Sequence, residues 1–498
     1  MKNTRKVPLF VVLATLLLAP PKRVLGQAQT TPAPDVKARM DTVVQRLGNA
    51  FMQQPARVGL SIGITQNGRA YFYHFGTTEK GKSQVATQNT PYEIGSISKT
   101  FTSLLLAHAV LEKRVSLNDD IRKYLPGAYP NLAFQGKPIT LKHLANTTSR
   151  LPNNLPKNLL EGLLQHASTD SVPLLAVKRM RGYTKQNFLA DLHQARLDTF
   201  PGLLPRHSNV ASQLLAYMLE SVYQASYADL LVRYIDQPLH LTGSAGTGPK
   251  STGYDGNGHH MPYDAIETSR ASGGLQYSPA DMVKYLQYQL AASDKAVALV
   301  QQPTWGRPDA EAIAFNWNLD QTVDGKRRLQ HSGGTFGYAS YCELYPQLQF
   351  GIVLLANESD PNTQAALQAT AWQIVDALYG VPPALQALRA GLAASQYRQA
   401  AAVVTAVKKK HPELHLTEAY VNTWGYTLLQ QGQPKAALEL FKLNVSLYPH
   451  AWNAYDSLAE TYESADDKPQ AIENYRRSLA LNPRNANAAE HLRKLGAK

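Results

Sequence analysis

A serine and a lysine lie three residues apart in the segment Ser96-Ile97-Ser98-Lys99. The apolar residues that follow predict a buried helix from Ser96 to about Lys113. Residues three apart share one face of a helix, so the Lys99 amine can reach the Ser96 hydroxyl. A serine hydroxyl is a weak nucleophile until a base takes its proton, and a desolvated lysine can be that base. The spacing indicates nucleophilic catalysis, although the same pattern also occurs by chance at the solvated start of an ordinary helix.

The position of this pair at a helix start adds a second chemical feature. A strand-like segment and Gly95 precede Ser96 directly. The first backbone N–H groups of a helix lack intrahelical partners and carry positive potential. They can therefore stabilise the oxyanion that forms when a serine attacks a carbonyl group.

The segment EIGSISKTFTSLLLAHAV around Ser96 resembles the active-site helix of serine β-lactamases of class C and of related penicillin-binding proteins and esterases. The resemblance covers about residues 40–380, and several motifs in order are far more specific than any one of them. Its later segments are Ile139 to Ser149 (ITLKHLANTTS), Pro201-Gly202, His207-Ser208-Asn209, Ala271 to Ser278 (ASGGLQYS) and His331 to Gly337 (HSGGTFG). By this resemblance, Ser96 is acylated and Lys99 is its base partner.

The second motif of the family is usually Tyr-x-Asn, and this chain has His207-Ser208-Asn209 there. The resemblance assigns Asn209 to hydrogen bonds with the substrate and the lysine. His207 replaces the tyrosine, and its unperturbed pKa near ~6.5 leaves a neutral fraction at pH 7 that can relay a proton. Two interpretations stay open: His207 moves the proton between Ser96 and the leaving group, or the replacement disables the site.

The third motif is usually Lys-Thr-Gly in β-lactamases and often His-x-Gly in the esterase-like and peptidase-like branches. Here it is His331-Ser332-Gly333, expected on the strand that flanks the nucleophile. His331 and Ser332 could bind a substrate carboxylate or polarise the site. The backbone N–H of Gly334 is our candidate for a second oxyanion donor beside that of Ser96. A further departure is Asn146-Thr-Thr-Ser-Arg150, where the family commonly has Thr-His-Thr-Ser-Gly, so we expect different loop packing there.

Apolar patterns predict the elements that must position these motifs. Two β-favouring runs between Val58 and Gly76 flank Asn67-Gly68, which is a strong hairpin signal. Strands at both ends of the unit with helices between them predict an α/β (α+β) fold, a mainly antiparallel sheet flanked by helices with a helical subdomain. The other expected elements are strands at Arg327–Leu329, Phe336–Tyr345 and Phe350–Ala356 and helices at Ser278–Ala292 and Gln364–Tyr379.

A repeat of 34 residues follows the turn signal at 380–383. It pairs Ala437 with Ala471, Phe441 with Tyr475, and Pro449 with Pro483. This period and these residue types resemble the tetratricopeptide repeat, with an earlier helical pair over 385–412 and a cap over 487–495. Such a helical module can bind a protein partner in a concave groove or can simply brace its neighbour.

The first 26 residues have the pattern of an export signal. Basic residues precede an apolar run from Val7 to Pro20, and Gly26 offers a small residue before a cleavage point. The run is short for a spanning helix of about 20 residues, so an uncleaved anchor stays open as the only route to membrane contact. We expect a signal at 1–26, a flexible lead-in at 27–38, a hydrolase domain at 39–380 and the helical module at 385–498.

Composition excludes several function classes. The chain has a formal charge of +13, and five basic residues but no acidic residue lie in the expected signal. A basic surface can favour anionic surroundings or simply keep the protein soluble, and no motif of a nucleic-acid-binding domain is present. Cys342, the only cysteine, is expected to be buried in a strand and excludes an intramolecular disulfide, and His259-His260 offers no set of metal ligands. We expect neither a metal nor a cofactor.

The sequence thus predicts an exported serine hydrolase of a bacterial cell envelope, periplasmic or secreted. Its substrate is a small molecule or peptide with an ester, β-lactam or D-amino-acid peptide bond. The alternative is a catalytically impaired sensor or scaffold that holds a partner through its repeats.

Overall fold

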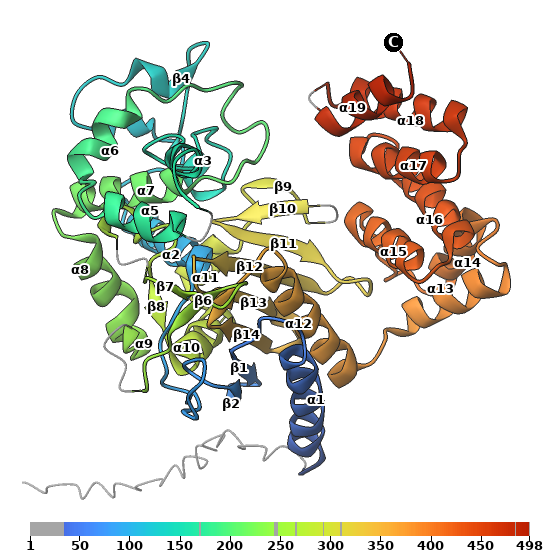
Figure 1. The fold of residues 1–498 in the computed structure, drawn as a ribbon, viewed down its shortest axis with the longest axis horizontal. Coiled ribbons are helices and arrows are strands. Elements are labelled where there is room, and N and C mark those ends of the chain that lie inside the picture. Colours follow the sequence, from blue (N-terminus) through green and yellow to red (C-terminus); the bar gives the residue numbers. More distant parts are fainter. Residues whose placement is uncertain are drawn as a thin grey trace, which may run out of the picture.

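The computed structural model describes residues 34–168, 171–243, 248–263, 266–291, 293–308, 311–483 and 485–497 (Figure 1). The expected export signal lies outside these residues. Helix α1 (Pro34–Met52) begins inside the range expected to be a flexible lead-in, so that expectation is wrong for residues 34–38. Among the described residues, no helix combines the length and the apolar character needed to cross a membrane.

An eight-stranded antiparallel sheet forms the centre of the fold. Its strand order is β2-β1-β14-β13-β12-β11-β10-β9, so the hairpin near the N-terminus pairs with strands from the end of the domain. In the β1–β2 turn, Asn67 and Gly68 have φ of 49° and 78°, as the hairpin prediction requires. The strands are β1 (Gly59–Gln66), β2 (Arg69–Gly76), β9 (Trp305–Arg307), β10 (Glu311–Ala314), β11 (Trp317–Gln321), β12 (Arg327–Gly334), β13 (Ala339–Tyr345) and β14 (Phe350–Ala356).

Helices cover both faces of this sheet (Figure 1). Strand β14 shows why its sequence FGIVLLA is apolar throughout: Ile352 and Leu354 face one core, while Val353 and Leu355 face the other. On the first side lie α1 and α12 (Thr363–Tyr379). The other side holds α2 (Ser98–Leu111), α7 (Asn209–Tyr223) and α10 (Pro279–Gln289). The predicted antiparallel sheet with flanking helices is therefore confirmed.

Shorter elements complete the helical subdomain and the rim of the sheet. The helices are α3 (Leu141–Ala145), α4 (Leu159–Leu164), α5 (Val172–Met180), α6 (Lys185–Leu192), α8 (Tyr227–Leu231), α9 (Gln237–Leu239) and α11 (Lys295–Val300). The short strands are β3 (Tyr92–Glu93), β4 (Ala133–Phe134), β5 (Lys137–Pro138), β6 (Gly253–Asp255), β7 (His260–Met261), β8 (Gln276–Tyr277) and β15 (Glu358–Ser359).

Two predicted boundaries differ near the candidate site. Ser96 lies in a short 3₁₀ turn, η1 (Gly95–Ile97), and the α-helix begins at Ser98. Strand β13 begins at Ala339 rather than Phe336, because residues 335–338 form the tight turn after β12, where Thr335 N donates to Tyr338 O. The buried residue Cys342 lies in β13 as expected.

The C-terminal region is a curved stack of helices beside the β9–β11 side of the sheet (Figure 1). Helices α17 and α18 begin 34 residues after α15 and α16, so the region fits the expected repeats. Phe441 and Tyr475, which the period pairs, are both fully buried. The helices are α13 (Pro383–Ala394), α14 (Ala400–Lys410), α15 (Glu418–Gln430), α16 (Pro434–Leu447), α17 (Trp452–Ser464), α18 (Lys468–Leu481) and α19 (Ala486–Lys494).

The turn between β11 and β12 joins this stack to the sheet. Val323 is 7% exposed and belongs to the apolar core of the helical stack. The backbone N–H of His415 donates to the carbonyl oxygen of Val323 at 2.7 Å. One apolar side chain and one backbone hydrogen bond therefore help to dock the helices against the sheet.

We predict that Val323→Asp releases the helical stack from this turn, because burying an unpaired carboxylate costs several kcal/mol. Small-angle X-ray scattering should show a larger radius of gyration, and proteolysis near residues 380–383 should be faster. Val232→Asp is the matched control, because Val232 is 43% exposed. Equal radii of gyration for the two variants would show that the turn does not hold the stack.

Candidate active site

Ser96 is positioned by a close approach of two backbone segments. Gly95 has φ of +51°, and a Cβ there would collide with the backbone nitrogen of Gly334. A Cβ on Gly333 would lie 2.9 Å from the backbone nitrogen of Ser96. Glycines at both positions allow the end of β12 to pass directly over the η1 turn. The approach brings the backbone amides of Ser96 and Gly334 close together, where they can form the two-donor oxyanion site expected from the sequence.

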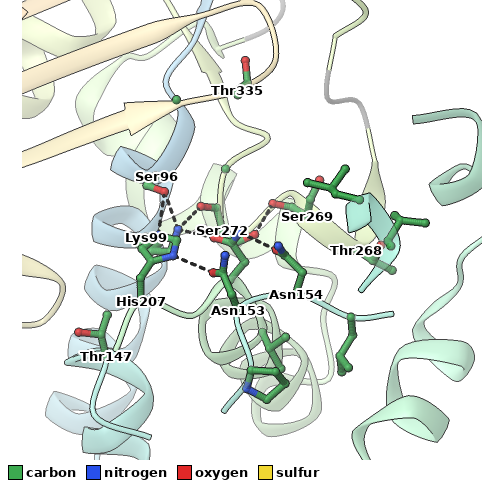
Figure 2. A pocket seen from close by; sticks show the side chains of 18 of the residues that line it. Ser96, Lys99, Thr147, Asn153, Asn154, His207, Thr268, Ser269, Ser272 and Thr335 are labelled. Carbon is green, nitrogen blue, oxygen red and sulfur yellow. Dashed lines mark hydrogen bonds between the residues drawn. The ribbon is translucent and has the colours of Figure 1, made fainter. Parts of the chain in front are cut away.

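Lys99 lies beneath Ser96 with its side chain fully buried. Its Nζ is 2.7 Å from Ser96 Oγ, 2.8 Å from Asn209 Oδ1 and 2.6 Å from the carbonyl oxygen of Ser272. The orientation of the Asn209 amide is supported by its Nδ2, which donates to Asn154 Oδ1 at 2.9 Å. The predicted helical spacing therefore brings the amine within hydrogen-bond distance of the hydroxyl (Figure 2).

These three partners determine what a neutral Lys99 can do. The oxygens of Asn209 and Ser272 can only accept hydrogen bonds, so they take the two hydrogens of the neutral amine. The lone pair is then left to face Ser96 Oγ and can accept its proton. Burial lowers the pKa of Lys99 to about 7, so a large fraction of the amine is neutral near physiological pH.

His207 lies on the open side of Ser96. Its Nε2 is 3.5 Å from Ser96 Oγ, and its Nδ1 is 2.8 Å from Asn153 Oδ1. Because the amide oxygen is an acceptor, the neutral ring carries its hydrogen on Nδ1 and presents an unprotonated Nε2 to Ser96. Desolvation and the nearby charge of Lys99 lower the pKa of His207 to about 4. The ring is thus neutral at pH 7, but it is a weaker base than the unperturbed value used in the sequence analysis implies.

The third motif lies at the end of β12, beside the nucleophile. His331 Nδ1 is 2.6 Å from the carbonyl oxygen of Ser332. Burial and the charge of Lys99 lower the pKa of His331 to about 3, so this ring also stays neutral. A neutral ring favours the second role expected for His331, polarising the site, over the binding of a substrate carboxylate by charge.

A cavity of about 860 Å³ joins these groups (Figure 2). Seven of the eight predicted site residues line it, and Gly333 packs directly behind Ser96. The seven are Ser96, Lys99, His207, Asn209, His331, Ser332 and Gly334. Among the lining residues that sequence reasoning missed, Asn153, Asn154 and the carbonyl of Ser272 bond directly to the predicted site residues. Ser272 lies in the quoted ASGG segment, whereas no sequence signal marked the two asparagines.

The loop that carries these asparagines departs from the family as expected. Arg150, where the family commonly has glycine, has φ of +65°. Its guanidinium makes two bonds to the Asp198 carboxylate, at 2.9 and 2.8 Å. This ion pair, with the one from Arg206 to Asp198, lowers the pKa of Asp198 to about 2. Side-chain bonds therefore help to hold a backbone conformation that glycine would adopt without strain.

The adjacent histidines of the sequence analysis lie outside this cavity. His259 Nδ1 is 3.0 Å from Asp255 Oδ2, so this ring has a carboxylate as its partner. In the described part of the chain, no group of three or more His, Cys, Asp or Glu side chains is placed to hold a metal ion.

Comparisons with known proteins concern the family and the fold of this chain. The family described as Beta-lactamase matches residues 44–377. "Protein flp" of Staphylococcus aureus (strain MRSA252) is 27% identical over 362 residues, which cover 69% of this chain and 67% of that protein. The "Beta-lactamase" of Escherichia coli (strain K12) is 25% identical over 384 residues, covering 68% and 94%.

Solved structures are similar in fold, and one example follows. The β-lactamase/D-alanine carboxypeptidase from Yersinia pestis, complexed with citrate, has a TM-score of 0.57 and 22% sequence identity. The match covers 69% of this chain and 99% of that chain. The remaining part of this chain includes the helical stack, so the likeness concerns the sheet and its flanking helices.

The pH dependence of acylation tests the assignment of Lys99. Because the neutral amine is the reactive form, the second-order rate of Ser96 acylation should fall about tenfold per pH unit below about pH 7. His207→Ala should slow acylation without moving this midpoint. Asn209→Asp should move it to higher pH, since a carboxylate beside the amine stabilises its charged form. A midpoint near pH 4 would instead point to His207, and one near pH 10 would show that burial does not neutralise Lys99.

Proposed function

The chain belongs to the beta-lactamase family, and we propose that it is an exported serine hydrolase that acts through an acyl-enzyme, with Ser96 as nucleophile. The observation that carries the proposal is the position of Lys99 Nζ, 2.7 Å from Ser96 Oγ with two carbonyl acceptors as its other partners. This arrangement makes the amine a base for that one hydroxyl.

The reaction begins when Ser96 Oγ attacks the substrate carbonyl and gives its proton to Lys99. The oxyanion is held by the backbone N–H groups of Ser96 and Gly334. The tetrahedral intermediate collapses, the bond to the leaving group breaks, and the proton passes from Lys99 to the departing oxygen or nitrogen. Water then attacks the acyl-enzyme, its proton returns through the same base, and Ser96 is regenerated.

His207 is suited to pass that proton. Its unprotonated Nε2 faces Ser96 Oγ from the cavity side. Asn153 keeps the hydrogen on the far nitrogen, as an orienting residue does in a catalytic triad. The neutral ring can accept a proton at Nε2 and return it to a leaving group that lies in the same cavity. These features favour a working site over the impaired sensor or scaffold.

The charges of the cavity favour esters among the three substrate classes expected from the sequence. A β-lactam or a D-alanyl peptide usually presents a carboxylate, which a cation must bind. His331 is neutral, and the lining cations are Lys99, whose amine is occupied, and the exposed Lys157. An ester or amide without a free carboxylate needs no such cation. We therefore place ester hydrolysis first and D-amino-acid peptide or β-lactam hydrolysis after it.

Two parts of the proposal concern the cellular setting. The basic and apolar N-terminus supports export to a bacterial envelope, where esters and peptides are available to a hydrolase. The helical stack, which fits repeats, supports binding of a protein partner in addition to the small-molecule or peptide substrate.

A labelled fluorophosphonate should modify Ser96 of the folded protein, and Ser96→Ala should lose the label. On p-nitrophenyl acetate, nitrocefin and a D-Ala dipeptide, we expect the ester to give the highest kcat/KM. Lys99→Met should lower that value by about 10²–10⁴.

His207→Ala separates the enzyme from the alternative binding protein. A loss of existing turnover identifies the ring as a proton carrier. No labelling and no turnover in the folded wild-type protein, together with a gain of turnover in His207→Tyr, would favour the impaired sensor and sink the proposal.

A further inference from the structure

The active-site cavity extends well beyond the catalytic groups into an apolar arm. Residues from α4, α5 and α6 line this arm together with Leu155, and they share one cavity with Ser96. The arm residues are Leu155, Leu159, Leu160, Ala176, Met180 and Phe188. Leu155, Ala176 and Phe188 are buried at 8, 3 and 2% exposure, so the wall behind the arm is solid protein.

Asparagines separate this arm from the nucleophile. Asn153 bonds to His207 and Asn154 bonds to Asn209, so both amides have partners in the catalytic group (Figure 2). The charged residues at this end of the cavity, Lys157 and Glu161, are exposed at its rim. A ligand that enters the arm from the nucleophile therefore passes the two asparagine amides and then contacts apolar side chains.

Exposed leucines lie on or next to the elements that line this arm. Five of the six leucines that are strongly exposed among the described residues fall between residues 164 and 204. They are Leu164, Leu174, Leu175, Leu203 and Leu204, and they are 37–55% exposed. Helix α4 buries none of its side chains fully, although four of its six residues are leucine. Exposed apolar side chains on elements that also line a cavity are characteristic of a region that receives an apolar ligand.

We infer that the arm binds the hydrocarbon chain of an ester substrate. The inference rests on the proposed function and specifies its substrate. Ser96 Oγ forms a bond to the ester carbonyl carbon, the bond to the alcohol oxygen breaks, and that oxygen takes the proton released by Ser96. Water hydrolyses the acyl-enzyme to a carboxylic acid. The hydrocarbon chain of the substrate lies against Met180 and Leu160. It belongs to either the acyl part or the alcohol part of the ester.

The physical basis is transfer of methylene groups from water into this arm. Full burial of each methylene favours binding by about fourfold. This binding free energy raises kcat/KM only if the hydrocarbon chain stays bound in the arm in the transition state. The wall of α5 and α6 belongs to the cavity that contains Ser96, which meets this condition.

The test uses the full-length protein and two ester series below their aggregation concentrations. One series is p-nitrophenyl esters from acetate to decanoate, and the other is acetate esters of alcohols from ethanol to decanol. We expect kcat/KM to rise at least about 30-fold with chain length in one series, and that series identifies the side of the ester that enters the arm.

Substitutions in the arm locate the effect. Met180→Gln and Leu160→Gln should each reduce the ratio of kcat/KM for the decyl ester to that for the shortest ester at least about fivefold. Leu111→Gln is the matched control, since Leu111 is 42% exposed and is not among the residues that line the cavity. It should leave this ratio unchanged.

Each of the other possible results contradicts the inference. If short esters are hydrolysed and neither series depends on chain length, the inference is wrong while the proposed function stands, and the leucines serve another contact. A dependence that both arm variants leave intact also overturns it. If no ester is hydrolysed and Ser96 takes no label, the inference and the proposed function fail together.

Discussion

The site depends on one amine that is kept out of water beside one hydroxyl. Burial brings the pKa of Lys99 from its ordinary 10.5 to about 7, so holding the charged form in this place costs roughly 5 kcal/mol. A typical domain has a net stability of only about 5–15 kcal/mol, so the rest of the fold must be well packed to tolerate this cost. Two carbonyl acceptors direct the neutral amine at Ser96 and keep its hydrogens bonded.

The surrounding fold positions Lys99 beside Ser96. The N-terminal hairpin pairs with β14, and apolar cores cover both faces of the sheet, which holds β12 rigidly against the η1 turn. Glycines at 95 and 333 permit the close approach that brings the oxyanion amides together. The helical subdomain contributes the opposite wall, with Asn209 at the start of α7 and Asn153 in the loop after Arg150. The same subdomain supplies the apolar arm, so the groups proposed for catalysis and the proposed binding site for a hydrocarbon chain share one cavity.

Sequence reasoning was reliable where the determining interactions are local. The hairpin at Asn67-Gly68, the spacing of Ser96 and Lys99, and the 34-residue period of the helices follow from neighbours in the chain. The fold class followed from motif order and strand pattern. Asn153 could not be found in this way, because its role exists only through a contact with His207, 54 residues away. The neutral states of His207 and His331 likewise depend on tertiary burial and on the charge of Lys99. The predicted lead-in includes Pro34, where α1 begins, although proline is common in the first turn of a helix.

The most direct measurement is an NMR titration of the protein carrying lysine labelled with ¹³C at Cε, with the Lys99 signal assigned by its loss in Lys99→Met. The account predicts that Lys99 titrates with a midpoint near pH 7. A midpoint near its ordinary value of 10.5 would contradict the claim that burial prepares its amine as the base for Ser96.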